Sequence, residues 1–387
     1  MRILILAHPL FLISESMPRF ARMLKEGITE AGHEATIIRP KPYFYTLFGR
    51  TRAAKWASYL DQFVLFPFIV IAWDLRSPKD TLFVFADQAL GPWVPYVRRH
   101  RKIIHCLDLL ALKSALGLVP ENPTSFTGRL YQKYIRWGFQ HCSNFISISA
   151  RTAADLEKYG AVRAVISEVV HLGLNYGYRR LASDSVNKSL LKIGLDVSCD
   201  GYLLYVGGGQ WYKNRRGLLR IYGKYAASTT NPLPLICVSP NPDSVLRATI
   251  AQLPSEAEVH FLQGVDSKVL EALYSGARTM IFPSHAEGFG WPIIEAQACG
   301  CPVITTNDAP MNEISGPVAR LIPKIDATTT LEEWARNASS VLLQTLSLTE
   351  EDVSLEQQAA MHWAAQFTSE RQIARYIEIY SEVMSMP

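Results

Sequence analysis

Phe282-Pro-Ser-His-Ala-Glu-Gly-Phe-Gly-Trp-Pro-Ile-Ile-Glu-Ala-Gln-Ala-Cys-Gly-Cys-Pro-Val303 is the most informative stretch of the sequence. The apolar run that ends at Phe282 predicts a buried strand. Pro292 predicts the first turn of a helix, where the N–H that proline lacks would have no partner. A second apolar run from Pro302 to Thr305 predicts the next strand. A strand, a helix and a strand in succession indicate a parallel sheet.

The same alternation extends from this segment in both directions and predicts an α/β fold of two Rossmann-like domains. A polar stretch without apolar periodicity, residues 179–188, predicts a linker. We therefore expect an N-terminal domain over 1–183 and a C-terminal domain over 184–368, with a last helix, 369–387, returning to the N-terminal domain. The predicted strands are 2–7, 34–39, 82–86, 102–107, 144–149, 165–171, 202–206, 233–238, 259–262, 279–282 and 302–305. The predicted helices are 17–31, 129–142, 151–159, 215–227, 243–253, 267–275, 292–299 and the stretch from 331 onward.

Length and composition agree with two globular domains. The 387 residues are too many for one compact core, and 48% of them are hydrophobic while 19% are charged. A net charge of +4 gives no indication of nucleic-acid binding. The six cysteines form no C-x-x-C pair, which argues against zinc and thioredoxin-type sites and predicts free thiols in a reducing compartment. The longest apolar run, 63–73, is shorter than the roughly 20 residues of a spanning helix.

The loop after Phe282 predicts a binding site for an anion. Backbone amides around Phe289, Gly290 and Trp291 would lie at the positive end of the following helix, a favourable position for phosphate. Glycine in this loop permits a close approach of the backbone to a ligand. Glu287 and Glu295 flank the loop, and two carboxylates beside an anion make sense if they bind sugar hydroxyls. The alternative is a surface loop with solvated glutamates.

This segment resembles the signature of the family 4 glycosyltransferases, which have the GT-B fold of two facing Rossmann-like domains. The family pattern is E-G-F-G-x-P-x-x-E-A-x-A-x-G-x-P-V, and 287–303 matches it closely. The resemblance implies that Glu287 holds hydroxyls of a donor sugar and that Glu295 binds the ribose of the nucleotide.

A second segment, Tyr205-Val-Gly-Gly-Gly-Gln-Trp-Tyr-Lys-Asn214, resembles the family's diphosphate loop. The resemblance implies that Lys213 contacts the donor diphosphate, together with the backbone of Gly207, Gly208 and Gly209. The family usually has an arginine after the first glycine, and here glycines stand in its place. Their N–H groups, Arg215 or Arg216 are the candidates to replace that charge. The loop around Val265 resembles the one that contacts the nucleotide base.

The N-terminal half departs from the family at one position. The strand 103–108 resembles the family's strand that ends in His-Asp, but Leu107 precedes Asp108. His105 lies on the same face of that strand as Leu107, so it either takes over the contact with the donor sugar or is an ordinary buried histidine. Asp87, after the strand 82–86, and Asp108 are candidates for the acceptor side.

Two further features bear on ligands and partners. No pair of aspartates separated by one residue occurs in the chain, which favours a site that needs no metal or other cofactor. The stretch 41–73 is rich in aromatic and basic residues, a composition that suits either contact with a membrane interface or a helix covering the first sheet. We expect a cytoplasmic protein, acting free in the cytoplasm or at the inner face of the plasma membrane.

These observations predict a retaining glycosyltransferase. It would move a sugar from a GDP- or UDP-linked donor to a saccharide or lipid-linked acceptor, in the synthesis of a bacterial polysaccharide or glycolipid. Two alternatives remain open: a nucleotide-sugar epimerase of related fold, and a catalytically silent subunit that binds a sugar nucleotide. Incubation with donor alone, and then with donor and acceptor, separates the three.

Overall fold

The structure is a computed structural model, and it describes residues 1–12, 16–49, 51, 53–197, 201–326 and 328–386. The chain divides into two compact units, Met1–Gly173 with Ser369–Pro387, and Leu174–Thr368. The boundary therefore precedes the stretch 179–188 that we expected to be a linker. Most of that stretch is ordered in the second unit, where helix α8 begins at Ser183 and packs against α11.

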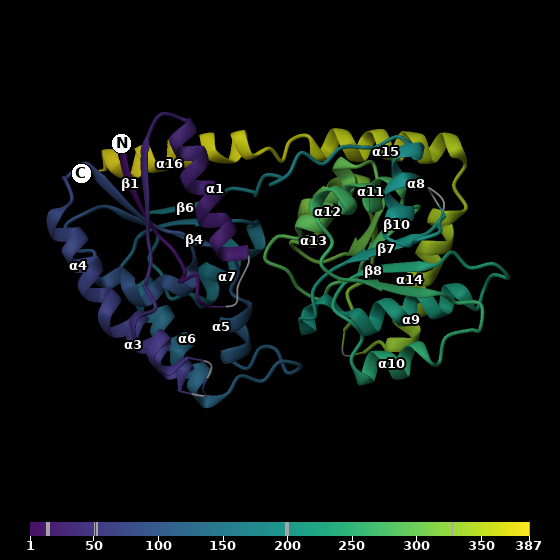
Figure 1. Cartoon of the computed structure of the whole chain (residues 1–387), viewed down its shortest axis with the longest axis horizontal. Helices are drawn as coiled ribbons and strands as arrows, with labels where there is room; N and C mark the ends of the chain where they lie inside the picture. Colours follow the sequence, from purple (N-terminus) through teal and green to yellow (C-terminus); the bar gives the residue numbers. More distant parts are fainter. Residues whose placement is uncertain (13–15, 50, 52, 198–200, 327, 387) are drawn as a thin grey trace. The chain divides into compact units, whose positions relative to one another are not determined.

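The first unit is a parallel six-stranded sheet with the strand order β2-β1-β3-β4-β5-β6 (Figure 1). Its strands are β1 (Arg2–Leu6), β2 (Glu34–Ile38), β3 (Thr81–Phe85), β4 (Lys102–Cys106), β5 (Asn144–Ser147) and β6 (Ile166–Val169). Its helices are α1 (Ser16–Glu30), α2 (Tyr43–Phe48), α3 (Ala54–Leu60), η1 (Asp61–Leu65), α4 (Phe66–Arg76), η2 (Gln88–Tyr96), α5 (Leu110–Ala115), α6 (Phe126–Phe139), α7 (Ala150–Tyr159) and α16 (Ser369–Ser385).

Alternate residues of these strands face two different layers of helices. One face carries Phe83, Phe85 and Ile104, which pack with side chains of α4, η2 and α6. The opposite face is covered by α1 and α16, which contact each other, and α16 also contacts β4 (Figure 1). Because both faces are covered, the inner strands β3 and β5 are buried at every residue, and β1 and β4 at all but their first, as expected for a parallel sheet.

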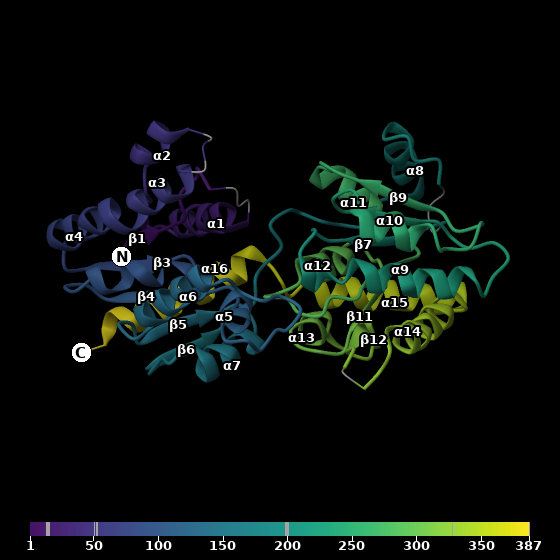
Figure 2. The same cartoon turned by 90° about the horizontal axis from the view of Figure 1, so that it is seen from below.

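The second unit is also a parallel six-stranded sheet, with the order β12-β11-β10-β7-β8-β9 (Figure 2). Its strands are β7 (Leu203–Val206), β8 (Leu235–Val238), β9 (Val259–Leu262), β10 (Thr279–Phe282), β11 (Val303–Thr306) and β12 (Arg320–Ile322). Its helices are α8 (Ser183–Lys192), η3 (Trp211–Lys213), α9 (Arg215–Ala226), α10 (Ser244–Ile250), α11 (Ser267–Gly276), α12 (Trp291–Ala298), α13 (Met311–Ser315), η4 (Gly316–Val318), α14 (Leu331–Leu346) and α15 (Glu350–Ala364).

Both sheets contain a point at which the strand order reverses. In the first sheet, β1 lies between β2 and β3, and in the second, β7 lies between β8 and β10. Loops that leave the carboxyl ends of two such neighbouring strands turn to opposite faces of the sheet, and ligands of doubly wound folds bind in the crevice between them. The positions to inspect for a site are therefore the loops after β1 and β3 and those after β7 and β10.

Several elements of the two units were not predicted from the sequence. The segment 54–76 forms one continuous helical stretch of α3, η1 and α4, in which η1 is a π-helical turn. By length and composition alone this stretch could cross a membrane, although the apolar run 63–73 inside it is too short to do so. The short strand β12 was also missed, because its three residues show no usable periodicity.

Candidate functional site

The loops after β7 and β10 bring together two oppositely charged side chains. Lys213 ends the single turn η3 that follows β7, and Glu287 lies in the loop between β10 and α12. The Lys213 Nζ atom is 2.8 Å from Glu287 Oε1, and the two side chains are only 12% and 7% exposed. The ammonium group also lies 5.0 Å from the centre of the Phe282 ring. A buried pair of this kind holds both charges in fixed positions at the strand-order reversal.

Asn214 explains how the two loops are held together. Its backbone is left-handed, with φ 51°, a conformation that asparagine adopts more readily than most residues. Its side-chain oxygen accepts a hydrogen bond from Gly217 N at 3.1 Å and so caps α9. Its side-chain amide donates to Pro283 O at 2.9 Å, in the loop after β10. In the Lys-Asn pair of the sequence, Lys213 therefore carries the charge, and Asn214 holds the loop of Lys213 in place.

Glycine is required at two positions of these loops. A Cβ atom on Gly207 would lie 2.4 Å from the hydroxyl of the buried Tyr205, so a larger residue would have to displace that ring. Gly290 has φ 105° and precedes the first turn of α12. A glycine at each position leaves the backbone of these two loops without a side chain, which is compatible with the predicted close approach of a ligand. Arg215 lies at the same sheet edge, where its guanidinium donates to Ser239 Oγ and Pro240 O.

Glu295 is buried within α12, one turn after the loop that the sequence predicts to bind an anion. The Tyr274 hydroxyl, from α11, donates a hydrogen bond to Glu295 Oε2 at 2.9 Å. Burial and the neighbouring Glu295 charge raise the pKa of Tyr274, so this phenol stays protonated and acts as a donor. The tyrosine thus orients the Glu295 carboxylate, a feature that no sequence pattern indicated.

The other residues predicted around the nucleotide lie in two places. Val265 follows Gly264, whose φ is 65°, in the loop after β9 at the same edge of the sheet. Phe289 is buried and packs against Phe367, with ring centres 6.2 Å apart. The Phe289 ring is therefore a packing contact, and only the backbone amide of this residue was predicted to contact the ligand. Trp291 is half-buried at the start of α12.

The first sheet has a matching polar pair at its own strand-order reversal. His8 and Asp87 each lie two residues beyond the paired ends of β1 and β3, and His8 Nε2 is 3.1 Å from Asp87 Oδ2. Asp87 is fully buried and accepts a hydrogen bond from Ala89 N at 2.6 Å. Burial opposes protonation of the imidazole, but the Asp87 charge and hydrogen bond outweigh it and raise the pKa of His8. Asp87 was predicted from the sequence, but His8 was not. The signal that could have found His8 is its position two residues after its strand, the same as that of Asp87.

Asp108 and Leu107 lie near this pair, after β4. Asp108 Oδ1 accepts a hydrogen bond from Leu110 N at 3.0 Å, and Leu107 N donates to the side chain of Gln88 at 2.8 Å. Asp108 thus shapes the turn that leads into α5. The structure places it at the same edge of the sheet as Asp87, which follows the neighbouring strand β3.

His105 does not take the position that one interpretation of the sequence gave it. It is completely buried, and its Nε2 atom lies 2.7 Å from the Tyr380 hydroxyl of α16. The rings of Phe20 and Tyr376 pack edge-on against the imidazole. Burial lowers the pKa of His105 to about 3, so the ring is neutral. The expectation of a sugar contact is therefore wrong, because α16 covers the strand face that His105 shares with Leu107.

We expect His105→Ala to destabilise the first unit by about 3 kcal/mol, because a cavity forms and the buried Tyr380 hydroxyl loses its partner. The wild-type protein should also lose stability as the pH falls below 6.5, since an unfolded histidine binds a proton that the buried His105 resists. Thermal melts from pH 8 to pH 4 test both expectations. Tyr380→Phe is the matched control, because it removes the same hydrogen bond and keeps the pH dependence. An unchanged melting temperature in His105→Ala would contradict this assignment.

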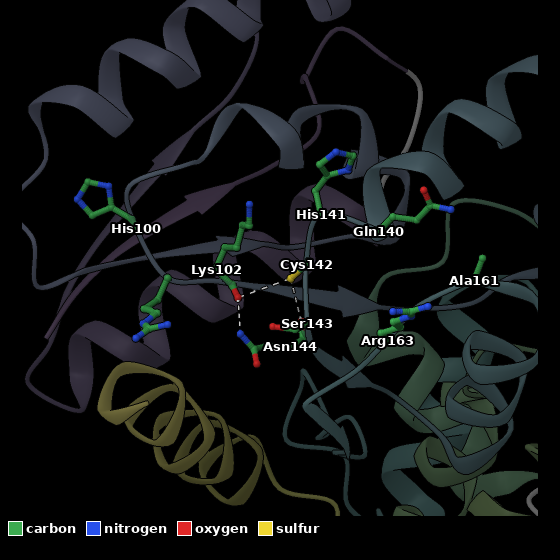
Figure 3. Close-up of a pocket in the computed structure, with 10 residues that line it drawn as sticks. His100, Lys102, Gln140, His141, Cys142, Ser143, Asn144, Ala161 and Arg163 are labelled. Carbon is green, nitrogen blue, oxygen red and sulfur yellow. Dashed lines mark hydrogen bonds between the residues drawn. The ribbon is translucent and has the colours of Figure 1, made fainter. Parts of the chain in front are cut away.

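A cavity of about 740 Å³ lies at the opposite edge of the first sheet (Figure 3). It is lined by residues around the amino ends of β4 and β5, including His100, Lys102 and Asn144. The Asn144 amide donates to Lys102 O at 3.0 Å, one of the hydrogen bonds drawn in Figure 3. None of the predicted site residues lines this cavity. Among the described residues there is also no group of three or more histidine, cysteine, aspartate or glutamate side chains arranged to hold a metal ion.

Known proteins match this chain in sequence and in fold. The pattern of the family "Glycosyl transferases group 1" matches residues 196–320. An O-antigen chain mannosyltransferase B of Escherichia coli is 38% identical over 122 residues, 31% of this chain and 32% of the relative. The O-antigen chain mannosyltransferase RfbU of Salmonella typhimurium is 25% identical over 193 residues, 50% of each chain. The matched segments thus span half or less of these relatives.

Solved structures match over the whole chain. Sucrose-phosphate synthase from Thermosynechococcus elongatus superimposes with a TM-score of 0.70 at 17% identity, covering 100% of both chains. Anabaena Alr3699/HepE in complex with UDP and glucose gives a TM-score of 0.71 at 15% identity, covering 99% of this chain and 100% of the other. At this identity the likeness shows the fold alone. Residues 196–320 are thus similar to the group 1 glycosyl transferases, and the two parallel sheets of the chain have the GT-B fold.

Proposed function

We propose that this protein is a retaining hexosyltransferase. It takes a sugar from a GDP- or UDP-linked donor and passes it to a saccharide or lipid-linked acceptor, in the synthesis of a bacterial polysaccharide or glycolipid. The observation that carries the proposal is the buried Lys213–Glu287 pair, which lies at the strand-order reversal of the second sheet and inside the segment that matches the family.

The pair suits a donor that brings a diphosphate and a sugar together. When the diphosphate binds, Lys213 exchanges the Glu287 carboxylate for phosphate oxygens, to which it contributes one positive charge. The amides at the start of α12 add further donors at the positive end of a helix. Glu287, released from the lysine, then accepts hydrogen bonds from sugar hydroxyls. The two residues of one ion pair would thus serve the two parts of a nucleotide sugar. Lys213 supplies a positive charge for the diphosphate, and Glu287 supplies a hydrogen-bond acceptor for the sugar hydroxyls.

The transfer step needs no nucleophile from the protein. The bond between the anomeric carbon and the diphosphate oxygen breaks while the acceptor oxygen bonds to the same carbon on the same face. The acceptor hydroxyl gives its proton to the departing diphosphate, whose negative charge Lys213 stabilises. The protein contributes position and electrostatic stabilisation, which are large terms in enzymatic catalysis.

The polar edge of the first sheet is the proposed place for the acceptor. The buried Asp87 carboxylate fixes the His8 ring, so that the imidazole is held ready to hydrogen-bond a hydroxyl. Asp108 adds a second carboxylate at the same edge. In this proposal His8 and Asp108 hold hydroxyl groups of the saccharide, and Asp87 positions His8.

A donor panel tests the proposal. GDP, UDP and ADP are compared by thermal shift, and the preferred nucleotide is then tested as its sugar, starting with GDP-mannose because the two relatives are mannosyltransferases. We expect transfer to an added acceptor with retention at the anomeric carbon, and we expect it to persist in EDTA. An isomerised donor without acceptor would indicate an epimerase, and nucleotide binding without turnover would indicate a silent subunit. Either result would overturn the proposal.

Glu295→Ala should weaken nucleoside diphosphate binding by about 1.5–3 kcal/mol, because a buried charged hydrogen bond to the ribose is lost. Isothermal titration calorimetry measures the change. Tyr274→Phe is the matched control, since it frees one Glu295 oxygen but keeps the carboxylate. If Glu295→Ala binds the nucleotide as tightly as the wild type does, the ribose assignment is wrong.

A further inference from the structure

The helical stretch 54–76 exposes an apolar stripe on the surface of the first unit. Trp56, Leu60, Val64 and Phe68 follow one another at intervals of four residues, one helical turn apart, and they are 64%, 43%, 48% and 68% exposed. The opposite side of the same stretch is buried, with Phe66 and Val70 in the core below. These four side chains lie largely in solvent, and a row of large exposed apolar residues is typical of an interaction surface.

A second helix widens this surface. On α6, Phe126 and Leu130 are 81% and 61% exposed. Rings from the two helices touch in an aromatic band: Phe63 lies 5.7 Å from Tyr131 and 5.8 Å from Tyr134, measured between ring centres. Between the helices is an apolar groove of about 550 Å³, lined by Tyr59, Phe63, Leu130, Tyr131, Lys133 and Tyr134.

Within residues 41–79 and α6 the exposed charges of the described residues are all positive, and the nearest exposed carboxylates along the chain are Asp80 and Glu121. Asp61 and Asp74 are the only acidic residues in 41–79, and α6 has none. Both aspartates are buried. The Asp61 carboxylate accepts hydrogen bonds from the backbone N–H groups of residues 44 and 45, and the Asp74 carboxylate accepts them from those of residues 98 and 99. The exposed cations are Lys41, Lys55, Arg76, Lys79, Arg129 and Lys133. The apolar stripe therefore has a cationic border with no exposed carboxylate in these segments.

We propose that this surface, formed by α3, η1, α4 and α6, docks on an anionic phospholipid bilayer. Apolar side chains that enter the headgroup region, with lysine and arginine beside them, bind such a surface by burial and by charge. Aromatic rings with a polar end suit the same interface. The helix lies on the membrane and does not cross it, because crossing would pull the two buried aspartates and the core residues Phe66 and Val70 out of the folded unit.

Vesicle flotation with the full chain, without donor or acceptor, tests the proposal independently of the glycosyl transfer. Vesicles of phosphatidylcholine alone are compared with vesicles that contain about one third phosphatidylglycerol. We expect binding to the anionic vesicles, and we expect the double variant Trp56→Ser/Phe68→Ser to weaken it at least about tenfold, by loss of buried apolar area. Lys55→Glu/Lys133→Glu should weaken binding by a similar factor, and high salt should weaken the wild type.

The control is Val245→Ser/Leu355→Ser, which removes two comparably exposed apolar side chains from the second unit and should leave binding unchanged. Equal binding of wild type and Trp56→Ser/Phe68→Ser would overturn the proposal, and so would absence of binding to anionic vesicles. A stable dimer in solution that the same double variant dissociates would assign the surface to a second copy of the chain instead. Binding that resists alkaline carbonate extraction would show a spanning helix and would also overturn it.

Discussion

Glu287→Ala is expected to lower turnover at least about 10²-fold while nucleoside diphosphate affinity stays equal to the wild type or improves. The side chain would hold sugar hydroxyls, and a donor sugar that is free to rotate spends little time in the reactive geometry. The nucleotide itself loses no contact. Lys213 is paired with Glu287 in this structure, so removing the carboxylate frees the ammonium group for the diphosphate.

Two measurements separate these effects. Calorimetry with the nucleoside diphosphate gives the affinity, and initial rates with the nucleotide sugar give the turnover. Glu287→Gln is the matched control, because it keeps the size of the side chain and its ability to accept a hydrogen bond while removing the charge. We expect its turnover to lie between those of the wild type and the alanine variant. Wild-type turnover in Glu287→Ala would refute the donor-sugar assignment.

Lys213→Met is expected to lower both nucleoside diphosphate affinity and turnover, the latter at least about 10²-fold, because the charge that stabilises the departing diphosphate is lost. It should also destabilise the second unit by about 3 kcal/mol, since the buried Glu287 carboxylate then has no cation beside it. Chemical denaturation measures the second effect and calorimetry the first.

The double variant Lys213→Met/Glu287→Met distinguishes a structural lysine from a functional one. With both charges removed, no buried charge lacks a partner, so stability should return close to that of the wild type. Nucleotide affinity and turnover should stay low, because the ammonium group is still missing. Recovery of activity together with stability would mean that Lys213 serves only the fold, and the proposed function would lose its main support.

The sequence by itself determined the fold class. Strand and helix patterns alternate along the whole chain, and they describe local preferences that each segment expresses wherever it lies. The segment 282–303 also predicted a site in its own loop, because the glycines and the helix start that would expose backbone amides are neighbours in sequence. The local pattern also singled out Glu287 and Glu295 beside this loop, whereas Lys213 was predicted through the family resemblance.

Only the tertiary structure decided what those residues touch. His105 is buried because α16 covers one face of β4. Its hydrogen-bond partner on α16, Tyr380, lies 275 residues further along the chain. Strand periodicity tells which residues share a face and cannot tell what covers that face. The Tyr274–Glu295 bond and the His8–Asp87 pair likewise join segments that are separate in sequence. The basic and aromatic stretch 41–73 could not be divided into core and surface either, until packing buried Asp61 and Phe66 and left Trp56 and Phe68 exposed.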